Sequence, residues 1–97
     1  MGREQSSRRG IGGAFYTLSK RAHDTARVAC TVSKKVAPRA VDRNRAKRVC
    51  RAVFAPHLKG TRGLFIVQVR TPALGAPHRE LAHEASRLMK EVIGRRN

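Results

Sequence analysis

Carboxylates and aromatic side chains are both scarce in this 97-residue chain, which has six Asp and Glu residues, no Trp, one Tyr and three Phe. A metal-dependent nuclease needs several convergent carboxylates to hold Mg²⁺, and six scattered acids offer no such set. Glu80 and Glu84 are four residues apart, which we interpret as the solvated face of a helix. No Ser/His/Asp or Cys/His arrangement suited to hydrolysis is present either. We therefore expect no catalytic residue and no metal site in the protein itself.

Cysteine pairs at metal-binding spacing and long apolar runs are also missing. Cys30 and Cys50 stand twenty positions apart, without a CxxC motif or a nearby His pair, so neither a zinc site nor a redox motif is indicated. Both fall in apolar patterns, where a free cysteine packs as a small hydrophobic residue. No run approaches the roughly 20 apolar residues of a transmembrane helix, and no signal-peptide core precedes the first strand. We expect a cytoplasmic protein with reduced thiols and no membrane partner.

Positive charge is what the chain has in excess. Its 22 Lys and Arg residues against six acids give a formal net charge of +16. Such a balance is typical of proteins that bind nucleic acid. A DNA-binding helix is one alternative, because basic helices enter major grooves, but no second helix precedes the basic one at helix-turn-helix spacing. The charge therefore favours a nucleic acid as the partner.

The charge is concentrated between Ser33 and Arg51, where eight Lys and Arg residues surround one acid, Asp42. Pro38 breaks the preceding segment, and the residues after it predict a helix to about Phe54. Apolar residues gather on one side of this helix, and basic residues recur every four positions on another. The apolar side is formed by Val41, Ala46, Val49, Cys50, Val53 and Phe54, and the basic side by Arg43, Lys47 and Arg51, widened by Asn44 and Arg48. Because like charges at this spacing weaken an isolated helix, the basic side indicates an anionic partner.

The remaining segments predict one small α+β domain. Residues 14–20 and 27–36 have the β-branched and aromatic content of strands and suit an antiparallel hairpin. Residues 64–70 form the most apolar strand, and residues 79–94 have a helical periodicity that ends at Gly94. The order β, β, α, β, α describes a sandwich of helices on a sheet. Residues 1–13 are polar, glycine-rich and basic, and we expect them to be a flexible segment outside the domain of residues 14–97.

The first strand contains a candidate base-stacking residue. Strand alternation puts Tyr16 and Leu18 on one face, and Phe15 and Thr17 on the other. A Tyr exposed on a basic sheet could stack a nucleobase, an interaction worth roughly 1 to 3 kcal/mol. The alternative is that both aromatic side chains of this strand fill the core. Alternation alone leaves the two interpretations open.

A family resemblance rests on the strand that ends in SKKV and on the helix after it. The segment RVACTVSKKVAPRAVDRNRAKRVCRAVF, residues 27–54, resembles the protein component of bacterial ribonuclease P. The family's RNR signature is matched by Arg43, Asn44 and Arg45, and its spacing continues in Lys47, Arg48 and Arg51. The run GLFIVQVRTPA, residues 63–73, and the closing helix are also similar, so the resemblance covers about the last eighty residues.

The resemblance implies a cytoplasmic accessory subunit of an endoribonuclease. In the family, one protein is expected to bind one large catalytic RNA and to help it remove the 5′ leader from precursor tRNA. The RNA performs the hydrolysis, and the RNA and the substrate, not the protein, hold the Mg²⁺ ions. The main alternative from another class is a small structural, ribosomal-type RNA-binding protein with no role in cleavage, which would share the size, the charge and the lack of catalytic groups.

The resemblance also implies a fold and a set of binding residues. The fold would be a small α/β sandwich like domain 2 of ribosomal protein S5, with a left-handed β-α-β crossover. Tyr16 and Leu18 would be candidates for the cleft that holds the leader. The family's N-terminal helix looks missing, because only MGREQSSRRGIGG precedes the first strand. The RNA-binding residues would be Lys34, Lys35, Arg43, Asn44, Arg45, Lys47, Arg48 and Arg51.

Overall fold

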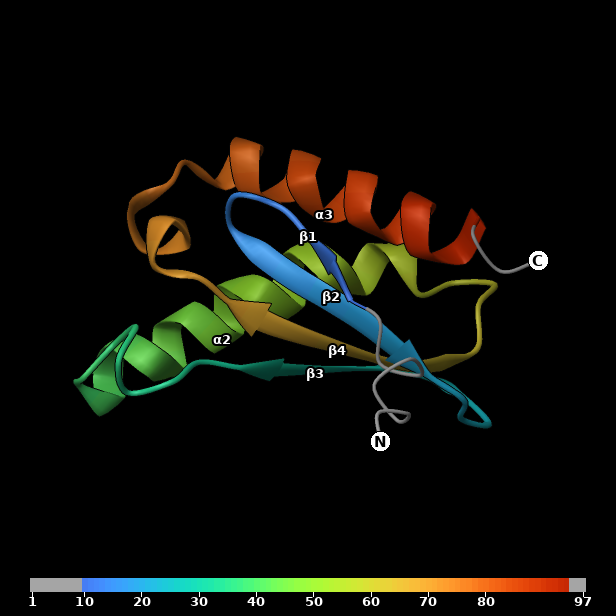
Figure 1. Cartoon of the computed structure of the whole chain (residues 1–97), viewed down its shortest axis with the longest axis horizontal. Helices are drawn as coiled ribbons and strands as arrows, with labels where there is room; N and C mark the ends of the chain where they lie inside the picture. The colour runs from blue at the N-terminus through green and yellow to red at the C-terminus, as the bar shows by residue number, and fades with distance from the viewer. Residues whose placement is uncertain (1–9, 95–97) are drawn as a thin grey trace, which may run out of the picture.

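The computed structural model describes residues 10–94, which form a four-stranded sheet with helices packed on one of its faces (Figure 1). The strands are β1 (Ile11–Gly12), β2 (Tyr16–Arg21), β3 (Ala26–Thr31) and β4 (Gly63–Val69). The α-helices are α2 (Ala40–Phe54) and α3 (His78–Gly94), and short 3-10 helices cover Ala55–His57 (η1) and Thr71–Gly75 (η2). The α+β class and the helix after Pro38 are confirmed.

The sheet has the order β1-β2-β4-β3. The predicted antiparallel hairpin of residues 14–20 and 27–36, which correspond to β2 and β3, is therefore wrong. β4 lies between them, antiparallel to β2 and parallel to β3. Val67 in β4 is opposite Leu18 on one side and Cys30 on the other. A central position pairs the backbone of β4 on both edges and buries its Phe65, Val67 and Val69 side chains. The most apolar strand, β4, therefore pairs with both β2 and β3, and these two strands do not pair with each other.

The connection from β3 through α2 to β4 is a left-handed crossover, as the resemblance implies. In Figure 1, β3 and β4 both point to the left, β4 lies above β3, and α2 crosses behind the sheet. Parallel strands are joined with the opposite hand in almost all proteins. Because only residues 32–39 join β3 to α2, the helix starts beside the ends of β3 and β4, next to the turn that contains Lys34 and Lys35.

The core lies between the sheet and the two helices α2 and α3. Tyr16 packs edge-on against Phe54, with ring centroids 5.2 Å apart and planes at 75°, a geometry that aromatic pairs favour. The side chains that α2 and α3 bury in this core are those of Cys50, Val53, Phe54, Leu81, Ala85, Leu88 and Met89.

Val41 departs from its predicted place on the apolar side of the helix, because 67% of its surface is exposed. It lies in the first turn of α2, which projects beyond the end of β3 and so has no sheet beneath it (Figure 1). The apolar contact of α2 with the core therefore begins further along the helix, with Ala46 and Val49 half-buried and Cys50 fully buried.

The N-terminal segment is described only in part. Residues 1–9 of the segment that we expected to be flexible lie outside the described residues, as does any N-terminal helix there. Residues Ile11 and Gly12, which that expectation included, form the short edge strand β1 and pair with Leu18 and Thr17 of β2. Across residues 10–94, no helix has the length and apolar character needed to cross a membrane.

Candidate nucleic-acid interface

The basic helix α2 begins where the sequence predicts, one residue after an extended Arg39 (φ −89°, ψ 136°) that follows Pro38. The backbone N–H groups of Asp42 and Arg43 both donate to the Arg39 carbonyl oxygen, at 3.1 Å each. Asp42 lies in the first turn, where a negative charge interacts favourably with the helix dipole. The one acid of the basic segment therefore has a local role in starting the helix.

Arg43 has a structural role that the sequence did not reveal. Its Nη1 donates to the carbonyl oxygens of Ala37 and Pro38, at 3.0 and 2.9 Å. The side chain therefore folds back over the start of α2 and fixes the segment that enters the helix. Only part of its hydrogen-bonding capacity is left for an RNA phosphate, since a guanidinium has five N–H donors.

Replacing Arg43 by alanine should therefore lower stability as well as RNA affinity. Loss of the two hydrogen bonds to backbone carbonyls should reduce the free energy of unfolding by about 1 to 2 kcal/mol. Hydrogen exchange should quicken at the backbone amides of Val36 and Ala37, whose N–H groups hold the preceding turn by donating to Ser33 at 3.1 and 3.0 Å. Exchange unchanged at these amides, with only RNA affinity reduced, would contradict this structural role.

The exposed side of α2 carries cations that no acid of the described chain neutralises. Asn44, Arg45, Arg48 and Arg51 are exposed, and Lys47 is half-buried. Within residues 10–94, the ion pairs of the structure join Arg87 to Glu84 and Glu91 on α3, at 3.9 and 3.7 Å. The basic stripe, defined as these five residues of α2, is thus a fixed array of donors available to an anionic partner.

Lys34 and Lys35 lie in the turn just after β3, and both are exposed. The side-chain oxygen of Ser33 accepts a hydrogen bond from the Val36 N–H at 3.3 Å, and this adds to the backbone bonds of the turn. Figure 1 shows this turn beside the start of α2, so the two lysines extend the basic surface at that end of the helix. Of the eight residues that the sequence singled out for RNA binding, six belong to α2 and two to the turn beside its start.

Tyr16 and Leu18 occupy the core, which corrects their assignment as leader-cleft candidates. Tyr16 is 1% exposed and Leu18 is 0% exposed. Both point from β2 toward the helices, because the face chosen by strand alternation is the one that α2 and α3 cover. Burial raises the pKa of the Tyr16 hydroxyl above its ordinary value. Neither side chain is placed to stack on a nucleobase.

The other face of the sheet is open and polar, and the sequence analysis did not single it out. One hollow of about 540 Å³ is lined by residues of β2, β3, β4 and the turn after β3, among them Thr17, Thr31, Ser33 and Gln68. A second, of about 370 Å³, is lined by Ser19, Arg21 and Ile66, and it shares Thr17 and Gln68 with the first. The two hollows are therefore neighbours on this face of the sheet. The signal in the sequence for this face was the alternation of polar with apolar residues in β2 and β4, where Thr17 and Gln68 stand between buried residues.

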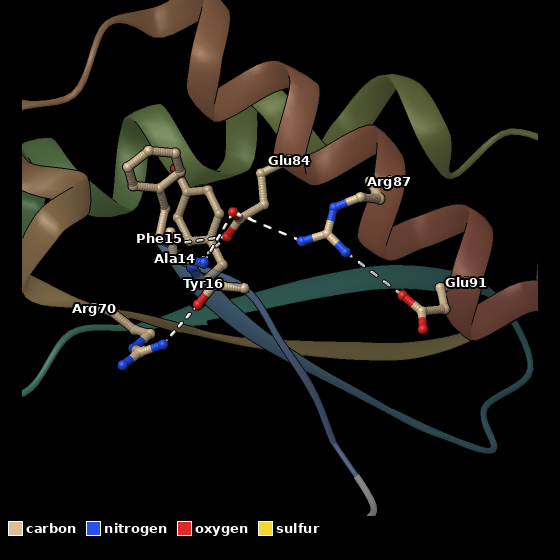
Figure 2. Close-up of polar contacts among 8 residues, drawn as sticks. Ala14, Phe15, Tyr16, Arg70, Glu84, Arg87 and Glu91 are labelled. Atoms are coloured by element: carbon tan, nitrogen blue, oxygen red, sulfur yellow. Dashed lines mark hydrogen bonds and ion pairs between the residues drawn. The ribbon is translucent and has the colours of Figure 1, made fainter.

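Glu84 is buried on α3, so its interpretation as part of a solvated face is wrong. Its two carboxylate oxygens accept hydrogen bonds from the backbone N–H groups of Ala14, Phe15 and Tyr16, at 3.0, 2.8 and 2.9 Å (Figure 2). Only 6% of the residue is exposed. The carboxylate holds the start of β2 against α3, and nothing in the local sequence predicts a contact across about seventy residues.

Metal-ligating side chains do not cluster in the part of the chain that the structure describes. In residues 10–94 no three or more His, Cys, Asp or Glu side chains gather closely enough to hold an ion. Glu84, the buried carboxylate of α3, is already occupied by its three backbone donors. What the site can do chemically is bind phosphate and other hydrogen-bonding groups of a nucleic acid.

Comparison with known proteins agrees with this geometry. The family model described as Ribonuclease P matches residues 3–93. The ribonuclease P protein of Staphylococcus aureus is 24% identical, with 96% of this chain and 86% of that chain covered and a TM-score of 0.75. The ribonuclease P protein of Thermotoga maritima is 20% identical, with 90% and 86% covered and a TM-score of 0.73. No curated protein sequence matched the chain. At these identities the structural likeness establishes the fold.

Proposed function

The chain belongs to the ribonuclease P protein family, and we propose that it is the protein subunit that binds the catalytic RNA of ribonuclease P and the 5′ leader of precursor tRNA. The observation that carries this proposal is the basic stripe of α2, whose three arginines are exposed and whose cations pair with no acid of the described residues. In this role the protein works in the cytoplasm as an accessory subunit, and hydrolysis belongs to the RNA.

The basic stripe and the Lys34–Lys35 turn would lie against the catalytic RNA. Arginine forks onto phosphate oxygens with two parallel hydrogen bonds, and lysine supplies a mobile point charge. Asn44 can donate to phosphate or accept from a ribose hydroxyl. Each phosphate neutralised releases condensed counterions, so binding should weaken steeply as salt is raised.

We propose that the Mg²⁺ ions are held by the catalytic RNA and the substrate, where they would activate water and stabilise the leaving oxygen. The donors that this chain presents near the RNA are cationic or neutral, which suits phosphate and not a metal ion. The contribution of these residues would be to reduce repulsion between the phosphates of the leader and of the catalytic RNA, and so to allow the substrate to bind when Mg²⁺ is scarce.

The single-stranded leader would lie along the open face of the sheet. This face offers hydroxyl groups from Thr17 and Thr31, an amide from Gln68 and a cation from Arg70. Arg70 is held in place because its Nη1 donates to the Gly13 carbonyl oxygen at 2.6 Å (Figure 2). These groups suit the phosphates and ribose hydroxyls of the sugar-phosphate backbone, whereas the buried Tyr16 offers no ring for stacking. Leader binding on this face should therefore depend little on the leader sequence.

Site-directed cross-linking tests the two surfaces in one experiment. Single cysteines at Arg51, Gln68 and Lys90, in a background with Cys30 and Cys50 replaced by alanine, would each be labelled with a photoactivatable group. In the complex of protein, catalytic RNA and precursor tRNA, the label at residue 51 should attach to the catalytic RNA and the label at residue 68 to the leader.

Residue 90 is the matched control, because Lys90 is an exposed cation on α3 and belongs to neither surface. Its label should attach to neither RNA above background. Cross-links to the leader from residue 90 and not from residue 68 would contradict the proposed path of the leader. Uniform attachment from all three positions would indicate nonspecific binding by charge.

A further inference from the structure

Two cysteines far apart in the sequence meet in the core, under the RNA-facing helix. Cys30 in β3 and Cys50 in α2 are twenty residues apart, and their Sγ atoms lie 2.8 Å from each other. Both thiols are free. The apolar patterns around them predict two small hydrophobic residues of the core, and their burial is confirmed. The contact between the two thiols adds chemistry that their spacing in the sequence does not indicate.

We propose that Cys30 and Cys50 form an internal disulfide when a hydroperoxide oxidises them, and that this bond locks α2 onto β3. The two sulfurs face each other across the junction of α2 and β3, so only a small approach of the two elements is needed for a bond. A disulfide has an S–S distance of about 2.05 Å, so the two sulfurs need to move closer by less than 1 Å.

The reaction balances with one hydroperoxide as the oxidant. The Cys30 thiolate attacks one oxygen of hydrogen peroxide, the O–O bond breaks, and Cys30 becomes a sulfenic acid. The other oxygen leaves as hydroxide and takes up a proton to become the first water. The Cys50 sulfur then attacks the Cys30 sulfur, forms the S–S bond and displaces a second water, with the Cys50 proton taken up by the leaving oxygen. In total the two sulfurs give up two electrons, and these reduce the two oxygens of hydrogen peroxide to two molecules of water. A dithiol reductant reverses the bond.

The surroundings distinguish the attacking thiol from the second one. Cys30 keeps 9% of its surface exposed, whereas Cys50 is 0% exposed, so a small peroxide reaches Cys30 first. The hydrogen bond with Cys50 lowers the pKa of Cys30; burial opposes this, and the positive charges of Arg51 and Lys47 add to the lowering. The same hydrogen bond and burial raise the pKa of Cys50. Cys30 is therefore the better nucleophile of the pair.

The bond would close a loop that contains the Lys34–Lys35 turn and the first part of the basic stripe. The RNA-facing side chains Asn44, Arg48 and Arg51 are exposed on α2, whereas Cys50 is buried in the core. The disulfide would thus tie α2 down from its buried side and leave its basic side unchanged. Cross-linking a loop of this size stabilises a protein mainly by restricting its unfolded state.

The test is to treat the reduced, full-length protein with hydrogen peroxide and measure its intact mass and its melting temperature. We expect a monomer lighter by about two mass units, the two hydrogens lost in disulfide formation. We also expect a melting temperature higher by roughly 10 °C or more, reversed by dithiothreitol. Oxygen added at Cys30 or Cys50 in place of the disulfide, as located by peptide mapping, a disulfide-linked dimer, or an internal disulfide with no rise in melting temperature would each overturn the proposal.

Single variants identify the order of the two steps. In Cys50→Ala the reaction should stop at the Cys30 sulfenic acid, which a cyclic 1,3-diketone captures as an adduct, whereas in Cys30→Ala adduct formation should fall at least tenfold. The reverse pattern would contradict Cys30 as the attacking thiol. Should either variant fail to fold, the mass and melting temperature of the unaltered protein still decide whether the disulfide forms and stabilises.

Discussion

Replacing Arg48 and Arg51 together by alanine should weaken binding of the ribonuclease P catalytic RNA by about a hundredfold. Both side chains are exposed on the outer side of α2, and the ion pairs of the described residues leave them free for phosphate. A charge-assisted contact worth about 1.4 kcal/mol corresponds to tenfold in affinity, and two separate contacts multiply. Fluorescence anisotropy at fixed salt and Mg²⁺ measures the effect. The salt slope should also fall by roughly 0.7 to 0.9 for each phosphate that the variant no longer neutralises.

The matched control removes the same charge from α3. Arg79 and Lys90 are exposed on that helix, so the double variant Arg79→Ala, Lys90→Ala has the same net charge as the α2 variant. It should bind the catalytic RNA nearly as well as the unaltered protein. Equal losses of affinity in the two double variants would mean that the protein binds RNA by net charge alone, and would count against α2 as the interface.

Replacing Glu84 by alanine should destabilise the fold more than any substitution on the basic stripe. The carboxylate accepts three backbone hydrogen bonds, one of them from the fully buried Tyr16. Buried donors left unpaired cost about 1 to 3 kcal/mol each. We expect a loss of about 3 kcal/mol or more in the free energy of unfolding, seen as a melting temperature lower by at least roughly 10 °C. Glu84→Gln keeps one acceptor oxygen, so its melting temperature should lie between those of the unaltered protein and the Glu84→Ala variant.

A pair of glycines tests the same contact from the other side. A Cβ atom at Gly13 would collide with the Glu84 carboxylate, whereas one at Gly12 would meet nothing within 4 Å. Gly13→Ala should therefore destabilise the protein, and Gly12→Ala should leave the melting temperature nearly unchanged. Equal effects at the two positions, or a stable Glu84→Ala variant, would show that the Glu84 contact does not hold the start of β2.

The elements predicted correctly are those whose signals are local. Pro38 and the four-residue recurrence of basic residues predict a helix that begins soon after Pro38 and ends at about Phe54, as α2 does, and the apolar run of residues 64–70 predicts β4. The hairpin of β2 and β3 was wrong because sequence proximity favours local pairing, while burial of β4 decides the sheet order. The contacts of Glu84 and the meeting of Cys30 with Cys50 are long-range, and no local pattern encodes them.

The candidate site was predicted only in part, because some of its features depend on local patterns and others on contacts between distant residues. Helical periodicity predicts four of the five members of the basic stripe, Asn44, Lys47, Arg48 and Arg51, because they share one helix, whereas Arg45 was singled out only by the family resemblance. Alternation in β2 separates its residues into two faces, but it does not indicate which face the helices cover. Tyr16 was therefore a candidate for binding the leader although it is buried, and the open face with Thr17 and Gln68 was missed. Arg43 was assigned to RNA alone, since its bonds to Ala37 and Pro38 depend on the turn that precedes the helix.

The measurement that tests the account most directly is 5′ cleavage of precursor tRNA by the ribonuclease P RNA from the same source, at low Mg²⁺, with and without this protein. We predict stimulation of cleavage at the mature 5′ position, abolished in the Arg48→Ala, Arg51→Ala variant and retained in the Arg79→Ala, Lys90→Ala variant. Tight binding to the catalytic RNA without any stimulation would contradict the proposal and identify a structural RNA-binding protein instead.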